Sequence, residues 1–86
     1  MVKKEVIVKS VTGLHARPGT DLVKLALSFD SNITLEKDGN IINGKEVFEI
    51  MTAAINCGDK IVVITEGTDE IEALEKIAEY IETVEG

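Results

Sequence analysis

The segment Thr12-Gly13-Leu14-His15-Ala16-Arg17-Pro18 holds the only histidine and the only proline of the chain. A strand-like alternation precedes it and a helix-like spacing follows it, so a strand passes into a helix here. Proline lacks a backbone N–H, which is harmless in the first turn of a helix because the early N–H groups have no intrahelical acceptor. His15 is therefore predicted at or beside the helix N-cap, where unpaired N–H groups and the helix dipole favour an anion.

Apolar periodicity on both sides of this segment predicts seven elements. Alternation marks strands and a spacing of three to four residues marks helices. The expected order is a strand through Val6 and Val8, a helix over 16–29, strands at 33–35 and 41–42 joined by an Asp38-Gly39 hairpin turn, a helix over 46–55, a strand over 60–65 and a helix after 67. This β-α-β-β-α-β-α order favours an α+β fold with one antiparallel sheet and helices on one face, although periodicity alone also fits ferredoxin-like domains.

The same periodicity predicts which side chains face the core. In the helix over 46–55 the core-facing residues are expected to be Val47, Ile50, Met51 and Ala54, with Phe48, Thr52 and Ile55 about 100° away on the cylinder. In the last helix, capped by Thr68 or Asp69, they are expected to be Ile71, Leu74, Ile77, Ala78 and Ile81. Phe48 should therefore be partly exposed.

Composition narrows the functional classes. The 86 residues suit one domain, 1–86, with 44% hydrophobic and 29% charged residues. Residues 44–86 hold 3 basic and 11 acidic groups, and this acidity together with three aromatic residues argues against nucleic-acid binding. One cysteine, Cys57, and one histidine leave no cluster for a structural metal, and we expect no cofactor. Without an apolar signal region or a membrane-length apolar stretch, we expect a cytoplasmic protein not inserted in a membrane.

If the His15 imidazole carried a phosphoryl group, neighbouring groups could bind its oxygens. Arg17 offers a guanidinium fork for phosphate oxygens, and the helix start offers oriented N–H donors. A neutral ring nitrogen can attack a phosphoryl donor directly, so transfer depends on positioning and charge stabilisation. The plainer alternative is a capping or surface histidine without chemistry. The combination of His15, Arg17 and Pro18 favours a phosphohistidine.

Residues 13–18, GLHARP, resemble the active-centre signature of the HPr family, the phosphocarriers of the phosphoenolpyruvate-dependent sugar phosphotransferase system. The resemblance covers the whole chain, including Asn43-x-Lys45-x-Val47-Phe48 and Met51. It implies an open-faced β-sandwich with a four-stranded antiparallel sheet and three helices on one face. It also implies that His15 accepts a phosphoryl group at Nδ1 from phosphorylated Enzyme I and passes it to a IIA domain for sugar uptake. The chain would then be a stoichiometric carrier and not an enzyme, with Arg17 stabilising the phosphate.

The family resemblance further implies a docking surface on the first and second helices for Enzyme I and the IIA domains. By position, Thr20, Lys24, Val47, Phe48, Met51 and Thr52 would supply it, as a small patch suited to transient exchange by a monomer. Thr12 and Thr20 are expected at the edge of the active centre.

Glu46 departs from the family pattern, because many relatives from Gram-positive bacteria have a regulatory serine there. Glu46 could serve the helix dipole as an N-terminal carboxylate, or it could act as a permanent partial mimic of phosphoserine. Glu49 adds a second acid nearby. The chain could therefore be the general carrier or a paralogue dedicated to one operon or a regulatory branch. A small-ligand regulatory domain, or an HPr-fold regulator acting only by binding, are the alternatives from other classes.

Overall fold

Four strands and three helices follow one another in the order predicted from the sequence. The computed structural model describes residues 1–85. Its elements are β1 (Val2–Ile7), α1 (Ala16–Leu27), β2 (Asn32–Lys37), β3 (Asn40–Asn43), α2 (Val47–Thr52), β4 (Lys60–Glu66) and α3 (Glu70–Thr83). None of the helices in residues 1–85 is both long enough and apolar enough to cross a membrane.

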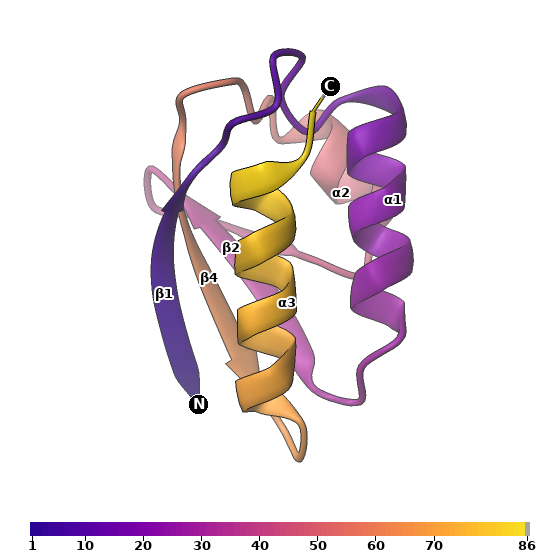
Figure 1. The fold of residues 1–86 in the computed structure, drawn as a ribbon, viewed down its shortest axis with the longest axis vertical. Helices are drawn as coiled ribbons and strands as arrows, with labels where there is room; N and C mark the ends of the chain where they lie inside the picture. The colour runs from indigo at the N-terminus through magenta and orange to yellow at the C-terminus, as the bar shows by residue number, and fades with distance from the viewer. Residues whose placement is uncertain (86) are drawn as a thin grey trace.

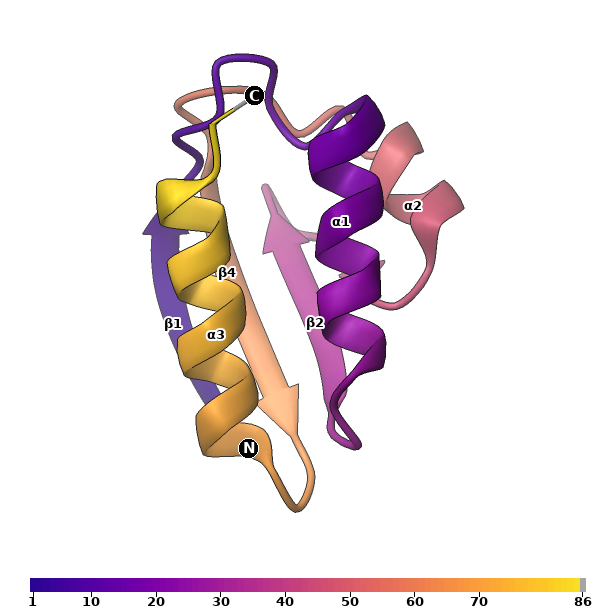
Figure 2. The same ribbon diagram turned by 45° about the vertical axis from the view of Figure 1, so that its right-hand side comes forward.

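The strands form one antiparallel sheet in the order β1-β4-β2-β3. The C-terminal strand β4 therefore lies between β1 and β2, with Val63 paired to Lys4 on one side and to Leu35 on the other. The helices cover one face of this sheet, and α1 and α3 run side by side across it (Figures 1 and 2). This is the predicted α+β open-faced sandwich.

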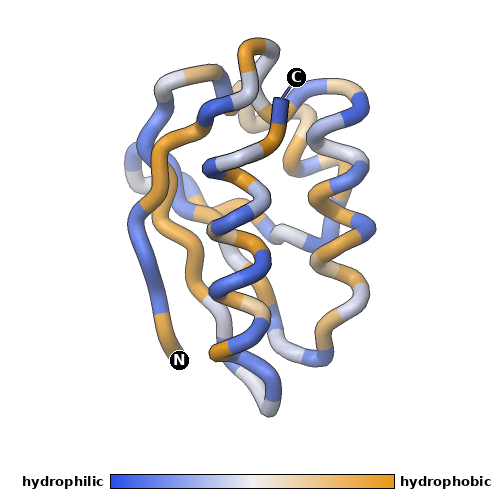
Figure 3. The backbone as a smooth tube through the Cα atoms, viewed as in Figure 1, coloured by the Kyte–Doolittle hydropathy of each residue, from blue (hydrophilic) through white to orange (hydrophobic). Residues whose placement is uncertain are grey.

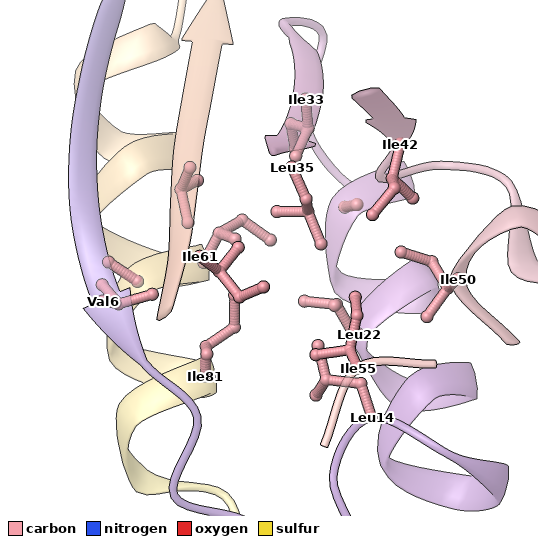
Figure 4. Packing of buried hydrophobic residues seen from close by; sticks show 14 of the residues in the cluster. Val6, Leu14, Leu22, Ile33, Leu35, Ile42, Ile50, Ile55, Ile61 and Ile81 are labelled. Carbon is pink, nitrogen blue, oxygen red and sulfur yellow. The ribbon is translucent and has the colours of Figure 1, made fainter. Parts of the chain in front are cut away.

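The core fills the space between the sheet and the helices. Alternate residues of β4 are buried, and the tube in Figure 3 alternates between hydrophobic and hydrophilic segments along α1. The labelled core residues in Figure 4 come from β1, β2, β3, β4 and from the helical layer, and they point toward one another: Val6, Leu14, Leu22, Ile33, Leu35, Ile42, Ile50, Ile55, Ile61 and Ile81. Each of these is at most 5% exposed.

The predicted hairpin between β2 and β3 is confirmed. Lys37 pairs with Asn40, so only Asp38 and Gly39 form the turn. Both have positive φ, at 51° and 84°. This is the backbone of a type I′ turn, which an Asp-Gly pair tolerates well and which matches the twist of antiparallel strands.

The second helix is shorter than expected, and the predicted burial of two of its residues is wrong. Helix α2 ends at Thr52, and Ala54 has a φ of 55°, which turns the chain out of the helix. Ala54 is consequently exposed, whereas Ile55 is fully buried. Val47, also expected in the core, is 41% exposed.

The predicted core face of the last helix needs one correction. Ile71 is 58% exposed, and Ala73 is buried in addition to Ile77, Ala78 and Ile81. At about 100° per residue, Ile71 lies about 100° from the line between Ile77 and Ile81, whereas Ala73 lies only about 60° from it. Residue spacing alone gave too wide an apolar stripe.

Candidate active centre

His15 is the N-cap residue of α1, as predicted. Its backbone is extended, with φ −102° and ψ 156°, and its side chain makes no hydrogen bond to its own helix. The half-buried imidazole instead places Nε2 2.9 Å from Oδ1 of Asn56. Among residues 1–85, no hydrogen-bond partner is found for Nδ1. The side chain is therefore fixed at one ring nitrogen and unengaged at the other, which does not fit a simple capping histidine.

The loop before His15 is anchored to the loop that follows α2. The Leu14 N–H donates to the Ile55 carbonyl at 3.0 Å, and the Leu14 side chain is fully buried. Gly13 has a φ of 71°, and a Cβ there would lie 2.2 Å from the same Ile55 oxygen. Only glycine allows the two loops to approach this closely. The glycine of the motif thus determines where His15 is presented.

Ala16, directly after His15, adopts a left-handed backbone conformation with a φ of 52°. For a residue with a Cβ this costs on the order of 1–3 kcal/mol. On one side Leu14 is fully buried and bonded to the Ile55 carbonyl, and on the other the Thr20 hydroxyl donates to the Ala16 carbonyl at 3.1 Å. The peptide between His15 and Ala16 is therefore set by tertiary structure and not by local preference.

Asn56 is the residue that sequence reasoning missed at this centre. Its Nδ2 donates to the Ala54 carbonyl at 3.1 Å, and its backbone N–H donates to Asp59 Oδ2 at 2.7 Å. That bond from Asn56, followed by the hydrogen bond from Lys37, holds the pKa of Asp59 below its usual range. The sequence signals a turn near Asn56-Cys57-Gly58, but no local pattern reports its contact with a histidine 41 residues away.

Arg17 lies in the first turn of α1 with its side chain 90% exposed. Its Nε is 3.7 Å from Asp21 Oδ2, a loose pair one turn along the helix. Arg17, Asp21 and Pro18 line a shallow open hollow of about 260 Å³ together with Tyr80, whose hydroxyl donates to the Pro18 carbonyl at 2.7 Å. Burial, followed by the charge of Asp21, raises the pKa of Tyr80. The Arg17 guanidinium, two residues after His15, is thus exposed and only weakly held.

Residues of the expected docking surface lie on α1 and α2, which are neighbours in Figure 2. Phe48 is 76% exposed, as predicted. Lys24 and Thr52 are also exposed, while Thr20 and Met51 are half-buried. Both threonine hydroxyls bond to their own helices: Thr20 Oγ1 donates to the Ala16 carbonyl at 3.1 Å and Thr52 Oγ1 to the Phe48 carbonyl at 2.9 Å. The exposed apolar side chains of this surface are thus Phe48 and its neighbour Val47.

Two acidic residues border this surface, and they differ in their contacts. Glu46 is the exposed N-cap residue of α2 and makes no side-chain capping bond. Glu49 accepts a hydrogen bond from the Asn43 N–H at 3.0 Å, which links α2 to the end of β3. Glu49 thus has a structural role that the sequence did not reveal.

Thr12, expected at the edge of the centre, shares a hydrogen bond with Ser10 at 3.3 Å.

Comparison with known proteins identifies the family. The family model described as "PTS HPr component phosphorylation site" matches residues 2–83. The chain belongs to the HPr family. The phosphocarrier protein HPr of Borreliella burgdorferi is 45% identical over 83 residues, covering 96% of each chain. A crystal structure of HPr from Bacillus anthracis is 44% identical with a TM-score of 0.91, covering 93% of this chain and 95% of that one.

HPr proteins are phosphoryl carriers of the phosphotransferase system and not catalysts, and this description extends to the present family member. A second group of relatives is also similar to it. The HPr-like protein Crh of Halalkalibacterium halodurans is 48% identical over 82 residues, covering 95% of this chain and 98% of that protein. A crystal structure of Crh from Bacillus subtilis, with a TM-score of 0.76 and 43% identity, covers 94% of this chain and 93% of that one, and is described as a domain-swapped dimer.

Proposed function

We propose that His15 accepts a phosphoryl group from phosphorylated Enzyme I at Nδ1 and passes it to a IIA domain of a sugar permease. The observation that carries this proposal is the state of the imidazole. Nε2 is engaged by Asn56, while Nδ1 has no partner among residues 1–85 and lies at the start of α1. The nitrogen left for attack is thus Nδ1, where the helix N-terminus favours a negative charge.

Transfer on this centre is a displacement at phosphorus. The Nδ1 lone pair forms the new N–P bond as the bond between phosphorus and the donor's histidine nitrogen breaks, and the donor nitrogen keeps that electron pair. Arg17 moves from its loose pair with Asp21 to the phosphoryl oxygens, where a guanidinium fork makes two charge-assisted hydrogen bonds. The second transfer, to the IIA domain, is the same displacement in reverse.

Partners dock on the surface formed by Thr20, Lys24, Val47, Phe48, Met51 and Thr52. Phe48 is the anchor, because an exposed aromatic side chain can fill a partner's pocket at low entropic cost. The patch is small, which suits an exchange of partners in which each complex must dissociate after transfer. The protein acts as a monomer in the cytoplasm, where it meets a donor charged by phosphoenolpyruvate.

A specialised paralogue is the second candidate. It is favoured by the exposed Glu46 beside the docking surface and by the similarity to Crh proteins. In this case the phosphoryl group would reach one dedicated acceptor or a regulatory branch. Glu46 would then hold the position of a regulatory serine with a permanent negative charge. Transfer to several purified IIA domains distinguishes the two candidates, since a general carrier serves many and a dedicated one serves a single acceptor.

The decisive experiment is incubation with Enzyme I and phosphoenolpyruvate followed by intact mass measurement. One added phosphoryl group is expected, labile in acid and stable in base as for a phosphoramidate. His15→Ala should abolish it, while circular dichroism confirms that the variant is folded. If that variant is phosphorylated in the same way, the active residue is not His15. A separate native mass measurement of the sample shows whether the carrier is a monomer.

A further inference from the structure

We infer that Asn56 is a positioning residue that holds His15 in the tautomer with hydrogen on Nε2, and so keeps the Nδ1 lone pair available for phosphoryl transfer. This inference rests on the proposed function and adds a residue from outside the motif. Asn56 lies in the loop after α2 and meets His15 at 2.9 Å across the junction of two loops. Within residues 12–18, no hydrogen bond to either ring nitrogen is found.

The orientation of the Asn56 amide follows from its second contact. Its nitrogen, Nδ2, donates to the Ala54 carbonyl at 3.1 Å, and a carbonyl can only accept. The other end of the amide facing His15 is therefore the oxygen, Oδ1. Because Oδ1 is an acceptor only, Nε2 must carry the hydrogen of this bond. In a neutral imidazole, the lone pair then resides on Nδ1.

The loop that carries Asn56 is held on both sides. The Asn56 N–H donates to Asp59 Oδ2 at 2.7 Å, and the same carboxylate pairs with Lys37 Nζ at 2.9 Å. Lys37 Nζ also donates to the Ala54 carbonyl at 2.7 Å. Lys37 is the last residue of β2, so these bonds connect the loop to the sheet. With Lys37 and Asp59 only 18% and 27% exposed, the network is partly shielded from solvent.

A neutral amide suits this position better than a carboxylate. An aspartate could also accept the Nε2 hydrogen, but its charge would favour the imidazolium form, which has no lone pair on either nitrogen. The amide selects the tautomer without stabilising a second proton. When Nδ1 forms the N–P bond, the hydrogen stays on Nε2 and keeps its hydrogen bond to Oδ1 of Asn56. The step thus requires no base to remove a proton.

Two variants separate this role from a structural one. Asn56→Ala removes both Oδ1 and Nδ2. Asn56→Asp keeps an acceptor for Nε2 but loses the donor to the Ala54 carbonyl. If Asn56 only stabilises its loop, both variants lose the same bond and behave alike. If it positions His15, the two variants differ at His15 itself.

The first measurement is ¹⁵N NMR of the His15 ring in the unphosphorylated protein. In the native chain we expect the tautomer with hydrogen on Nε2. Asn56→Ala should raise the fraction with hydrogen on Nδ1, whereas Asn56→Asp should keep hydrogen on Nε2 at every pH. Cys57→Ala is the matched control, because Cys57 is exposed and adjacent to Asn56 but makes no hydrogen bond to His15. An unchanged tautomer in Asn56→Ala would overturn the inference.

The second measurement is the pH profile of phosphoryl transfer. Losing one hydrogen bond to the ring should slow Asn56→Ala about threefold to tenfold across the profile. Asn56→Asp should be slow near neutral pH and should recover toward the native rate as pH rises and the imidazolium loses its proton. Parallel profiles for the two variants would show that Asn56 acts only on the loop. The NMR result needs no partner protein, so it tests Asn56 even if Enzyme I proves to be the wrong donor.

Discussion

The polar groups at the two ends of the molecule differ in how fully they are paired with one another. At one end α3 begins beside the turn between α1 and β2, at the bottom of Figure 1. At the other end α1 begins, beside the loop that follows α2. The first end consists of groups that bind one another. The second contains groups that are only partly engaged: Nδ1 of His15 has no hydrogen-bond partner among residues 1–85, and Arg17 pairs only loosely with Asp21.

At the α3 end, Asp69 is the central acceptor. Its Oδ2 accepts the Asp30 N–H at 2.9 Å, and its Oδ1 accepts both the N–H and the hydroxyl of Ser31. Although Asp69 is the N-cap residue of α3, its side chain makes no bond to that helix. The sequence correctly placed it at the helix start, but the carboxylate ties down a turn 38 residues earlier. Nearby, the amino group of Met1 pairs with Glu70 at 3.1 Å.

At the α1 end, the supporting groups are satisfied but the reactive ones are not. Asn56, Asp59 and Lys37 bind one another, while the Arg17 side chain is 90% exposed. We therefore expect function to be concentrated at the α1 end, where a rigid frame presents uncommitted groups. Substitutions of the reactive groups at the α1 end should change phosphoryl transfer and leave stability constant. Substitutions at the α3 end should lower stability and leave transfer unchanged.

The largest effect after loss of His15 is expected for Arg17→Ala. Hydrogen bonds to charged groups contribute about 1.5–3 kcal/mol, so loss of the fork should slow phosphoryl transfer about tenfold to a hundredfold. The melting temperature should stay nearly constant because the side chain is exposed. Rapid-quench transfer kinetics and thermal unfolding measure the two quantities. Lys76→Ala, which removes an equal charge from an exposed site on α3, is the control. A large loss of stability with normal kinetics would show that Arg17 is structural.

At the α3 end, Asp69→Asn should lower the melting temperature and leave transfer unchanged. An asparagine would turn its NH₂ group toward one of the backbone N–H donors that the carboxylate now accepts, and two donors cannot bond. Asp30→Asn is the matched control, because Asp30 uses its backbone N–H and not its carboxylate in this network. Slower transfer in Asp69→Asn, with Asp30→Asn normal, would mean that the two ends are coupled.

Stability at the α3 end should depend on pH. The Ser31 hydroxyl, followed by the Asp30 N–H, holds the pKa of Asp69 below its usual range. Stability from Asp69 is therefore fully present above the ordinary aspartate pKa and is lost as pH falls through the lowered value. The gap in melting temperature between the native chain and Asp69→Asn should be widest at neutral pH and should narrow in acid. A gap that stays constant would assign the loss to packing instead of charge.

The same contrast explains which parts of the site could be predicted from the sequence. His15 could be placed because Pro18 is a local signal for a helix start. Its partner Asn56 could not, since their contact depends on how two loops meet in space. The burial of Ile55 was missed for a related reason, because the positive φ of Ala54 leaves no trace in hydrophobic spacing. Local signals thus predicted the order of the elements and the candidate nucleophile, while tertiary contacts decided the frame around it.

The smallest effect is expected at Glu46, which adds a negative charge beside the docking surface. Exposed charge pairs contribute roughly 0–1 kcal/mol, so Glu46→Gln should change the apparent affinity for Enzyme I by no more than about fivefold. A heterologous Enzyme I with an acidic docking face should phosphorylate the variant faster at low ionic strength. Added salt should narrow the difference because it screens exposed charges. Steady-state phosphorylation at two salt concentrations measures both effects.

The native donor separates two explanations for Glu46. If the native Enzyme I has compensating basic groups, the same substitution should impair transfer from it while still helping the heterologous enzyme. Glu75→Gln is the matched control, since it removes an equal charge from an exposed position on α3, away from the docking surface. The site of phosphorylation, His15, should stay the same in both variants. The Glu46 side chain makes no capping bond to α2, so its replacement removes no such bond from the fold. If the native chain and Glu46→Gln are phosphorylated at equal rates by each donor at low salt, the charge of Glu46 has no part in partner selection.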